Sequence, residues 1–414
     1  MQEGQAEVVE LERALRLISS SGQHYLDLLK RNASHQSRES SEEIAEAKEL
    51  LLSQTHSFMQ TVGGPFRMVF KHGENLAYTG AVRALLEMGV FNALPSDGSS
   101  MTAAELAKRL SVDKELLVRL MRIATALGPF HEAGPEEYQH TAFSKIYLQP
   151  ELAGMLKILN DEHGPAYTHL HAHLSAHNWR NPTSATSNPY THAHRTGGKD
   201  FWAHVSQFPA RVRAFDDAMG AHTRASAWTV ETYPFAGELS QFETDDETVL
   251  FVDIGGGKGH VTRHVRGLCK AVRGKMVFLD RKEVVEGVNA GEGEWAVEGR
   301  ACDFFAGVPV KGALIYYLRR VLHDWPDEDC VKILKNVAAA MDKERSRLVI
   351  CELVVPPVGA AAETCWTDIT MMTFSGTERT EKQFEKLLAA AGMKLVKVYT
   401  AHGTNYGAIE AHLQ

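Results

Sequence analysis

The feature that most constrains the fold of this chain is a change of pattern near residue 246. Beyond it, short apolar runs alternate with amphipathic helical segments such as DEDCVKILKNVAAAMD. The apolar runs are TVLFVDI, KMVFLD, GALIYYL, RLVICELV, KLVKVYT and YGAIEAHL. Strands that alternate with helices along the chain form mostly parallel sheets. We therefore expect an α/β domain with a mostly parallel sheet over residues 246–414.

A glycine-rich loop follows the first of these predicted strands, in VLFVDIGGGKGHV. Glycine adopts positive φ freely and lets the backbone pass close to a ligand. The dinucleotide fingerprint G-x-G-x-x-G does not fit, because counting from Gly255 and Gly257 its third position is His260. The Lys-Ser/Thr ending of a P-loop is also missing from this segment. Asp280 ends the next strand, where a carboxylate can bind both hydroxyls of a ribose. The pattern indicates a nucleoside ligand without phosphates.

The first 150 residues read mainly as helices. TAAELAKRLSVDKELLVRLMRIATALGPF predicts two helices joined at SVD, and HEAGPEEYQHTAFSKIYL predicts short strands around a Gly-Pro turn. Two helices and a hairpin are the outline of a winged helix. Such a unit either reads DNA or serves packing and dimerisation. The second helix carries few cations on a strongly apolar face, which favours dimerisation over DNA binding.

Residues 151–245 combine helical stretches with a loop that contains two Asn-Pro steps. Nine of the 20 histidines fall between His163 and His222. His169, His173 and His177 would share one helix face. A metal stripe is one interpretation, and a polar pocket wall or a solvated face is the other. No carboxylate or cysteine joins that face as a further ligand, so we expect no metal site.

Composition excludes several classes of protein. A net charge of −8 argues against general affinity for nucleic acid. The five cysteines form no C-x-x-C pair, which fits reduced thiols in a cytoplasmic enzyme better than a disulfide framework or a zinc site. No run approaches about 18 apolar residues, and the acidic start MQEGQAEVVELERA lacks the apolar core of a signal peptide. We expect neither a membrane span nor a secretory signal.

The segment RRVLHDWPDED, residues 319–329, places a cation, an imidazole, a carboxylate and a tryptophan where a predicted strand ends. These residues are Arg319, His323, Asp324 and Trp325. In one interpretation the loop is simply polar, with the aspartate capping the next helix and the tryptophan in the core. In the other, a catalytic base lies beside a cofactor at the carboxyl edge of the sheet, where ligands of such folds bind.

Taken together, these motifs resemble a known family. VDIGGGKGH, FLDR, CDFF, LRRVLHDWPDE, ILKN, AMD, ICELVVP and SGTERTEKQFEKLLAAAG are similar, in order and spacing, to S-adenosylmethionine-dependent O-methyltransferases of the caffeic-acid and hydroxyindole type. Versions from fungal natural-product pathways look most similar. The resemblance implies a dimerisation domain at 1–150, a helical linker at 151–245 that contributes to the substrate pocket, and a Rossmann-like catalytic domain at 246–414.

The resemblance also implies roles for individual residues. Those expected to hold S-adenosylmethionine are Asp253, Gly255, Gly257, Asp280, Arg281, Asp303, Phe304, Arg319 and Trp325. In this set the glycines line the methionine part, Asp280 binds the ribose, and Asp303, Phe304 and Trp325 surround the adenine. The expected catalytic residues are the base His323 and its neighbours Asp324, Glu352 and Glu378. Those expected on the substrate side are His163, Met219, Met371 and Met372.

The expected reaction is O-methylation of a small secondary metabolite by a homodimer. A phenol with a pKa near 10 is mostly neutral at pH 7, so a positioned imidazole would contribute about 10²–10⁴-fold by removing its proton. A second hypothesis is a pericyclase of the same fold, which binds the cofactor and guides a cyclisation without moving the methyl group. A third is a DNA-binding regulator that uses the winged helix. The His323–Asp324 pair favours methyl transfer, because a cyclisation needs no base there.

Overall fold

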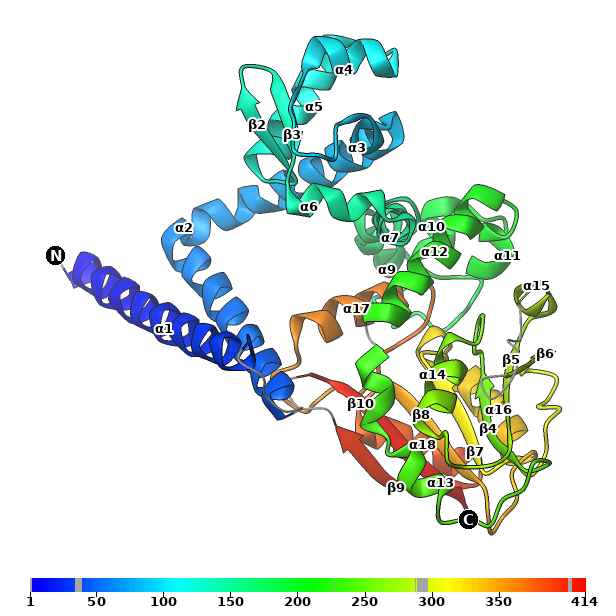
Figure 1. The fold of residues 1–414 in the computed structure, drawn as a ribbon. Coiled ribbons are helices and arrows are strands. Elements are labelled where there is room, and N and C mark those ends of the chain that lie inside the picture. Colours follow the sequence, from blue (N-terminus) through cyan, green and yellow to red (C-terminus); the bar gives the residue numbers. More distant parts are fainter. Residues whose placement is uncertain (1, 34–38, 226, 287, 289–296, 401–403) are drawn as a thin grey trace. The chain divides into compact units, whose positions relative to one another are not determined.

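The computed structural model describes residues 2–33, 39–225, 227–286, 288, 297–400 and 404–414. The chain forms two compact units, one reaching to residue 149 and one beginning at residue 150 (Figure 1). Within these described ranges, no helix is long and apolar enough to cross a membrane.

The N-terminal unit is mainly helical. Its helices are α1 (Gln2–Ala33), α2 (Glu39–Met88), α3 (Val90–Ala93), α4 (Ala103–Leu110), α5 (Lys114–Ala126), α6 (Ala142–Lys145) and the 3₁₀ turn η1 (Ile146–Leu148). The backbone of α2 is broken at Gly64, which has φ 66° and ψ 169° and is followed by Pro65. Helices α1 and α2 pack on each other.

The expected winged-helix outline is confirmed. Strands β1 (Met101–Thr102), β2 (Phe130–Gly134) and β3 (Glu137–His140) form an antiparallel sheet in the order β1-β3-β2. Helix α4 starts with a capping box between Thr102 and Glu105, and α5 starts at Asp113, whose carboxylate accepts the N–H of Leu116 at 2.7 Å. The SVD tripeptide therefore separates two helices because it ends one and caps the next.

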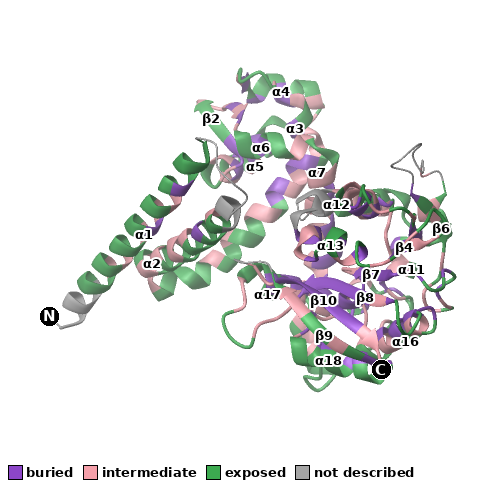
Figure 2. Ribbon diagram, turned by 60° about the horizontal axis from the view of Figure 1, so that its bottom comes forward, coloured by how far each residue is buried: buried purple, intermediate pink, exposed green. Residues whose placement is uncertain are grey.

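Most of the described residues of α1 and α2 are exposed (Figure 2), and many of the exposed residues are large and apolar. On α2 alone these include Met59, Val62, Phe66, Val69, Phe70 and Leu76, several of them more than 60% exposed. Exposed apolar residues in such number are typical of a surface that another chain covers.

The C-terminal unit contains a seven-stranded sheet in the order β6-β5-β4-β7-β8-β10-β9. Its strands are β4 (Val249–Ile254), β5 (Lys275–Asp280), β6 (Glu298–Ala301), β7 (Ile315–Arg319), β8 (Arg347–Leu353), β9 (Met393–Thr400) and β10 (Tyr406–Leu413). All neighbours are parallel except β10, which is antiparallel to β8 and β9. The expected mostly parallel α/β sheet is therefore confirmed.

Alternation along each strand distributes its side chains between two cores. On one face, Val252 and Ile254 pack with the apolar sides of α16 (Asp327–Ala338) and α18 (Glu381–Ala390). On the other face, Phe251 packs with Tyr317 and with residues of α13 (Phe235–Leu239) and α14 (His260–Leu268). Both faces are covered, which explains why these strands read as continuous apolar runs in the sequence.

The remaining helices of this unit lie before the sheet strands and between them in the chain. Between residues 150 and 232 they are α7 (Pro150–Lys157), the π-helical turn η2 (Ile158–His163), α8 (Gly164–Thr168), α9 (Leu170–Ala176), α10 (Pro189–His194), α11 (Phe201–Val205), α12 (Pro209–Ala225) and η3 (Ala227–Thr232). Helix α15 (Lys282–Val285) follows β5, the 3₁₀ turn η5 (Leu322–Asp324) follows β7, and α17 (Ala362–Met372) follows β8.

Candidate active site

The centre of the site is the catalytic turn, which we define as residues 320–326, between β7 and α16. One carboxylate from the end of β8 shapes this turn: Glu352 Oε1 accepts the backbone N–H groups of Val321, Leu322 and His323 at 3.2, 2.7 and 3.2 Å. Glu352 is fully buried, and burial raises the pKa of its carboxyl group. Its placement therefore fixes the backbone that carries His323.

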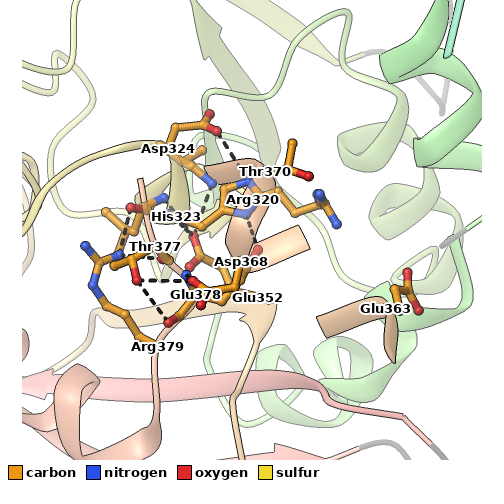
Figure 3. Close-up of polar contacts among 12 residues, drawn as sticks. Arg320, His323, Asp324, Glu352, Glu363, Asp368, Thr370, Thr377, Glu378 and Arg379 are labelled. Carbon is orange, nitrogen blue, oxygen red and sulfur yellow. Dashed lines mark hydrogen bonds and ion pairs between the residues drawn. The ribbon is translucent and has the colours of Figure 1, made fainter. Parts of the chain in front are cut away.

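The imidazole of His323 lies between two further carboxylates (Figure 3). Its Nδ1–H donates to Glu378 Oε1 at 2.8 Å, and Asp324 Oδ1 lies 3.5 Å from its Nε2. Burial by itself lowers the pKa of this buried imidazole, but the charges of Glu378 and Asp324 outweigh burial and the pKa is raised. The hydrogen bond at Nδ1 leaves Nε2 of the neutral ring as the atom able to accept a proton.

The segment 376–379 packs directly on the catalytic turn. Thr377 N–H donates to the carbonyl of His323 at 2.9 Å, and a Cβ at position 376 would collide with that same carbonyl, so only glycine fits there. Arg379 is fully buried. It donates to the carbonyls of Leu322 and Trp325 at 2.9 and 2.8 Å, and to Asp327 Oδ1 from both Nε and Nη2. These bonds hold the turn against the loop segment that carries Glu378.

The glycine loop lies at the carboxyl end of β4. Gly255 and Gly257 have φ 74° and 57°. A Cβ on Gly255 would lie 2.8 Å from Val321 Cγ2, whereas no atom lies within 4 Å of the position a Cβ on Gly257 would take. Gly257 N–H donates to Asp280 Oδ2 at 2.8 Å, and Arg281 N–H donates to Asp280 Oδ1 at the same distance. Burial raises the pKa of Asp280.

Asp253 lies near the end of β4, against Gly256 of the loop, and Arg319 is the last residue of the neighbouring strand β7. Asp253 is buried, accepts a hydrogen bond from Thr262 Oγ1 at 2.8 Å, and has a pKa raised to about 7 by burial. Arg319 Nη2 donates to Thr229 Oγ1 at 3.1 Å, and its charge reaches Asp253. The two charged groups therefore lie at the carboxyl ends of adjacent strands, close to the start of the glycine loop.

An aromatic group lies beside the catalytic turn. The ring of Trp325 meets that of Phe305 edge-on at 4.8 Å and that of Phe304 at 6.1 Å. Asp303 accepts the N–H of Phe305 at 2.9 Å, and Asn336 holds the carbonyls of both phenylalanines. Sequence reasoning missed Phe305, although its place next to Phe304 in CDFF was visible.

These residues fit an adenosyl ligand. Each oxygen of Asp280 uses one lone pair on a backbone N–H and keeps capacity for a ribose hydroxyl. The open space at Gly257 admits a ligand against the backbone. The half-buried rings of Phe304 and Trp325 offer apolar surface for a base.

His163 is the last residue of the π-helical turn and is buried. Thr373 Oγ1 donates to the carbonyl of Thr370, so it accepts from His163 Nδ1–H, 3.1 Å away. Burial lowers the pKa of His163 to about 4, so the ring is neutral with Nε2 as its acceptor. Its ring packs against Phe201 and Phe374.

The π-helical turn is held by an ion pair that sequence reasoning missed. Arg211 of α12 donates to Glu162 Oε1 at 2.6 Å and to the second oxygen, and Tyr190 donates to Glu162 Oε2 at 2.8 Å. Tyr167 also joins this segment to α17 through a 2.6 Å hydrogen bond with Thr370 Oγ1. Widely separated polar residues of this kind give no local signal in a sequence.

The remaining expected residues are distributed as follows. Met371 is buried in the cluster that contains Phe201 and Phe374, and Met372 is half-buried. Met219 is 39% exposed on α12. His173 and His177 stack at 4.0 Å, and among the residues that the structure describes no group of three or more potential ligands could hold a metal.

Comparisons with known proteins agree with this geometry. An O-methyltransferase domain model matches residues 183–394, and an O-methyltransferase dimerisation domain model matches residues 70–150. The O-methyltransferase opaF of Aspergillus ustus is 42% identical over 88% of this chain and 87% of its own length.

Solved structures show the same relationship. The structure of OxaC in complex with SAH and oxaline is 34% identical, with a TM-score of 0.87 over 99% of this chain and 100% of that chain. A pericyclic reaction enzyme shares the fold at 24% identity, with a TM-score of 0.82 over 97% and 100%. By its sequence, fold and matched domains, this chain belongs to the S-adenosylmethionine-dependent O-methyltransferase family.

Proposed function

We propose that this enzyme methylates a phenolic or enolic hydroxyl of a small natural product, with His323 as the general base. The observation that carries this proposal is the 2.8 Å hydrogen bond from His323 Nδ1 to Glu378. It leaves Nε2 as the proton acceptor. Asp324, 3.5 Å from Nε2, stabilises the imidazolium once the proton has moved.

The residues around the base supply the rest of the chemistry. Bound S-adenosylmethionine provides an electrophilic methyl group. His323 takes the proton of the acceptor hydroxyl, which raises the nucleophilicity of that oxygen. The buried side chains of Met371 and Phe374 keep water away from part of the site. His163, Met219 and Met372 are further proposed contacts of the acceptor.

The cofactor would be held along the carboxyl edge of β4, β5 and β7. Asp280 would bind the ribose hydroxyls, while Asp303, Phe304 and Trp325 would surround the adenine. The loop backbone at Gly255 and Gly257 would lie along the methionine part of the cofactor. Asp253, Arg281 and Arg319 would shape the loop around that part. Support comes from the backbone-anchored carboxylate of Asp280 and the open space at Gly257.

We also propose a homodimer working in a reducing compartment such as the cytoplasm. The matched dimerisation model at 70–150 and the exposed apolar residues of α2 support self-association. All five cysteines are free thiols, which suits a reducing environment.

The experiment is an assay of His323→Gln with methyl-labelled S-adenosylmethionine and a panel of phenolic and enolic acceptors. Glutamine keeps polarity but accepts no proton at neutral pH, so we expect turnover to fall about 10²–10⁴-fold with cofactor affinity unchanged. His412→Gln is the matched control, because it removes another His–Glu pair, formed with Glu410 on β10. Product of unchanged mass and no transferred label would instead identify a pericyclase and refute methyl transfer.

A further inference from the structure

Arg320, the first residue after β7, has a left-handed backbone with φ 55°. For a residue with a Cβ this conformation is unfavourable and persists only where the surroundings impose it. Here Arg320 N–H donates to the carbonyl of Cys351 at 3.2 Å, and the next N–H binds Glu352. These backbone hydrogen bonds therefore hold Arg320 in this conformation.

The guanidinium of Arg320 has an unusual set of partners. Its Nη1 donates to the hydroxyl of Tyr406 at 3.0 Å, and Tyr406 in turn donates to Glu363 at 3.4 Å. Within the described part of the chain, this is the only hydrogen bond of the guanidinium, and no ion pair joins it to a carboxylate. By contrast, Arg211 and Arg379 each bind a carboxylate. Burial raises the pKa of the Asp324 carboxyl group and the positive charge of Arg320 acts to lower it, but no ion pair joins these two described residues. A half-buried cation without an ion pair can still bind an anionic ligand.

The positive charge of Arg320 opposes proton uptake by His323 but suits the binding of an anion. Figure 3 shows Arg320 in the same part of the site as His323, and the two side chains interact electrostatically. The charge of Arg320 disfavours the imidazolium form of His323 and so works against the base. A cation placed here assists catalysis only if it stabilises an anion that forms when the proton leaves. That anion is the deprotonated acceptor.

We propose that Arg320 binds a carbonyl oxygen conjugated with the hydroxyl that is methylated. The inference rests on the proposed function and narrows the acceptor to one class: enolised β-dicarbonyl compounds and phenols with an ortho carbonyl group. When the hydroxyl proton moves to His323 Nε2, the electron pair stays on oxygen and is shared with the carbonyl oxygen. Nη2 and Nε of the guanidinium donate hydrogen bonds to the carbonyl oxygen that carries this charge, while Nη1 keeps its hydrogen bond to Tyr406.

The test uses two probes of nearly the same shape, 2′-hydroxyacetophenone and 2-ethylphenol, of which only the first has the carbonyl oxygen. Binding to the full-length protein saturated with S-adenosylhomocysteine is measured by calorimetry, and label transfer is measured in parallel. A charge-assisted hydrogen bond predicts that the wild type prefers the first probe by about 10–150-fold. Arg320→Gln should abolish this preference, and Arg320→Lys should keep part of it.

Arg320→Asn is a second variant, because asparagine tolerates the left-handed conformation and preserves the turn. Arg345→Gln, at an exposed arginine, is the matched control and should retain the wild-type preference. Equal binding of both probes by the wild type, binding of neither, or a preference that survives in Arg320→Asn would overturn the inference. An Arg320-dependent preference without label transfer refutes the proposed function alone. Label transfer that is indifferent to Arg320 refutes the inference alone.

Discussion

Replacing Glu378 by glutamine tests how the site sets the basicity of His323. The two side chains are almost completely buried, with 5% and 0% exposure, and their hydrogen bond is 2.8 Å long. Glutamine keeps an oxygen that can accept from Nδ1–H but removes the charge. An opposite charge this close shifts a pKa by about 1–3 units, so the variant loses that support while the lowering effect of burial remains.

The direction of the pH effect follows from these two contributions. In the wild type the pKa of His323 is raised above 6.5, so the base is free only at higher pH and the rate falls as pH drops through that raised value. In Glu378→Gln the acid limb should move to lower pH by about 1–3 units. The plateau rate should fall as well, because the imidazolium has lost about 1.4–4 kcal/mol of stabilisation.

The assay is the pH dependence of kcat with a saturating acceptor, beside cofactor titration at each pH. Glu385→Gln is the control, since it makes the same chemical change at an exposed position of α18 and should leave the profile unchanged. The charged His323–Glu378 pair stabilises the fold fully below pH 6.5 and loses this effect as pH rises through the raised pKa. The melting temperatures of variant and wild type should therefore differ most at low pH. An acid limb that does not move would refute this account of the base.

Three further predictions concern the cofactor loop and the catalytic turn. Gly257→Leu places a branched side chain at positive φ in the space left for the ligand, so calorimetry should show S-adenosylmethionine binding lost. Asp280→Ala should weaken S-adenosylmethionine binding by about 1.5–3 kcal/mol. Unchanged affinity in this variant would refute the proposal that Asp280 binds the ribose. Arg379→Lys cannot keep both carbonyl bonds and the paired bonds to Asp327, and should lower thermal stability and kcat together. Asp327→Asn, at the exposed end of that pair, should cost less in both measurements.

The central strands were predictable from sequence because burial on both faces makes them continuous apolar runs. TVLFVDI, KMVFLD and RLVICELV all became strands of the sheet. Strand β6, with the sequence EGRA, was missed because it lies at the sheet edge, pairs only with β5, and is mostly exposed. Nothing in its composition separates it from a loop.

The candidate site divides in a similar way. Residues that sit together in the chain, such as His323 and Asp324, gave a sequence signal through their crowding at a strand end. Arg379 gave none, because most of its partners are backbone carbonyls, and a carbonyl is present at every position. The Glu162–Arg211 pair joins residues 49 positions apart, and only the fold brings them into contact.

The arrangement around His323 also bears on the choice between methyl transfer and cyclisation. Glu352 orders the turn through three backbone N–H groups. Glu378 accepts a hydrogen bond from Nδ1 of His323, and Asp324 lies near Nε2. A cyclisation that releases no proton gains nothing from stabilising an imidazolium. Proton removal gains from it directly, because the imidazolium is the state that forms as the acceptor becomes a nucleophile. The buried carboxylates therefore favour methyl transfer on physical grounds that the shared fold by itself does not supply.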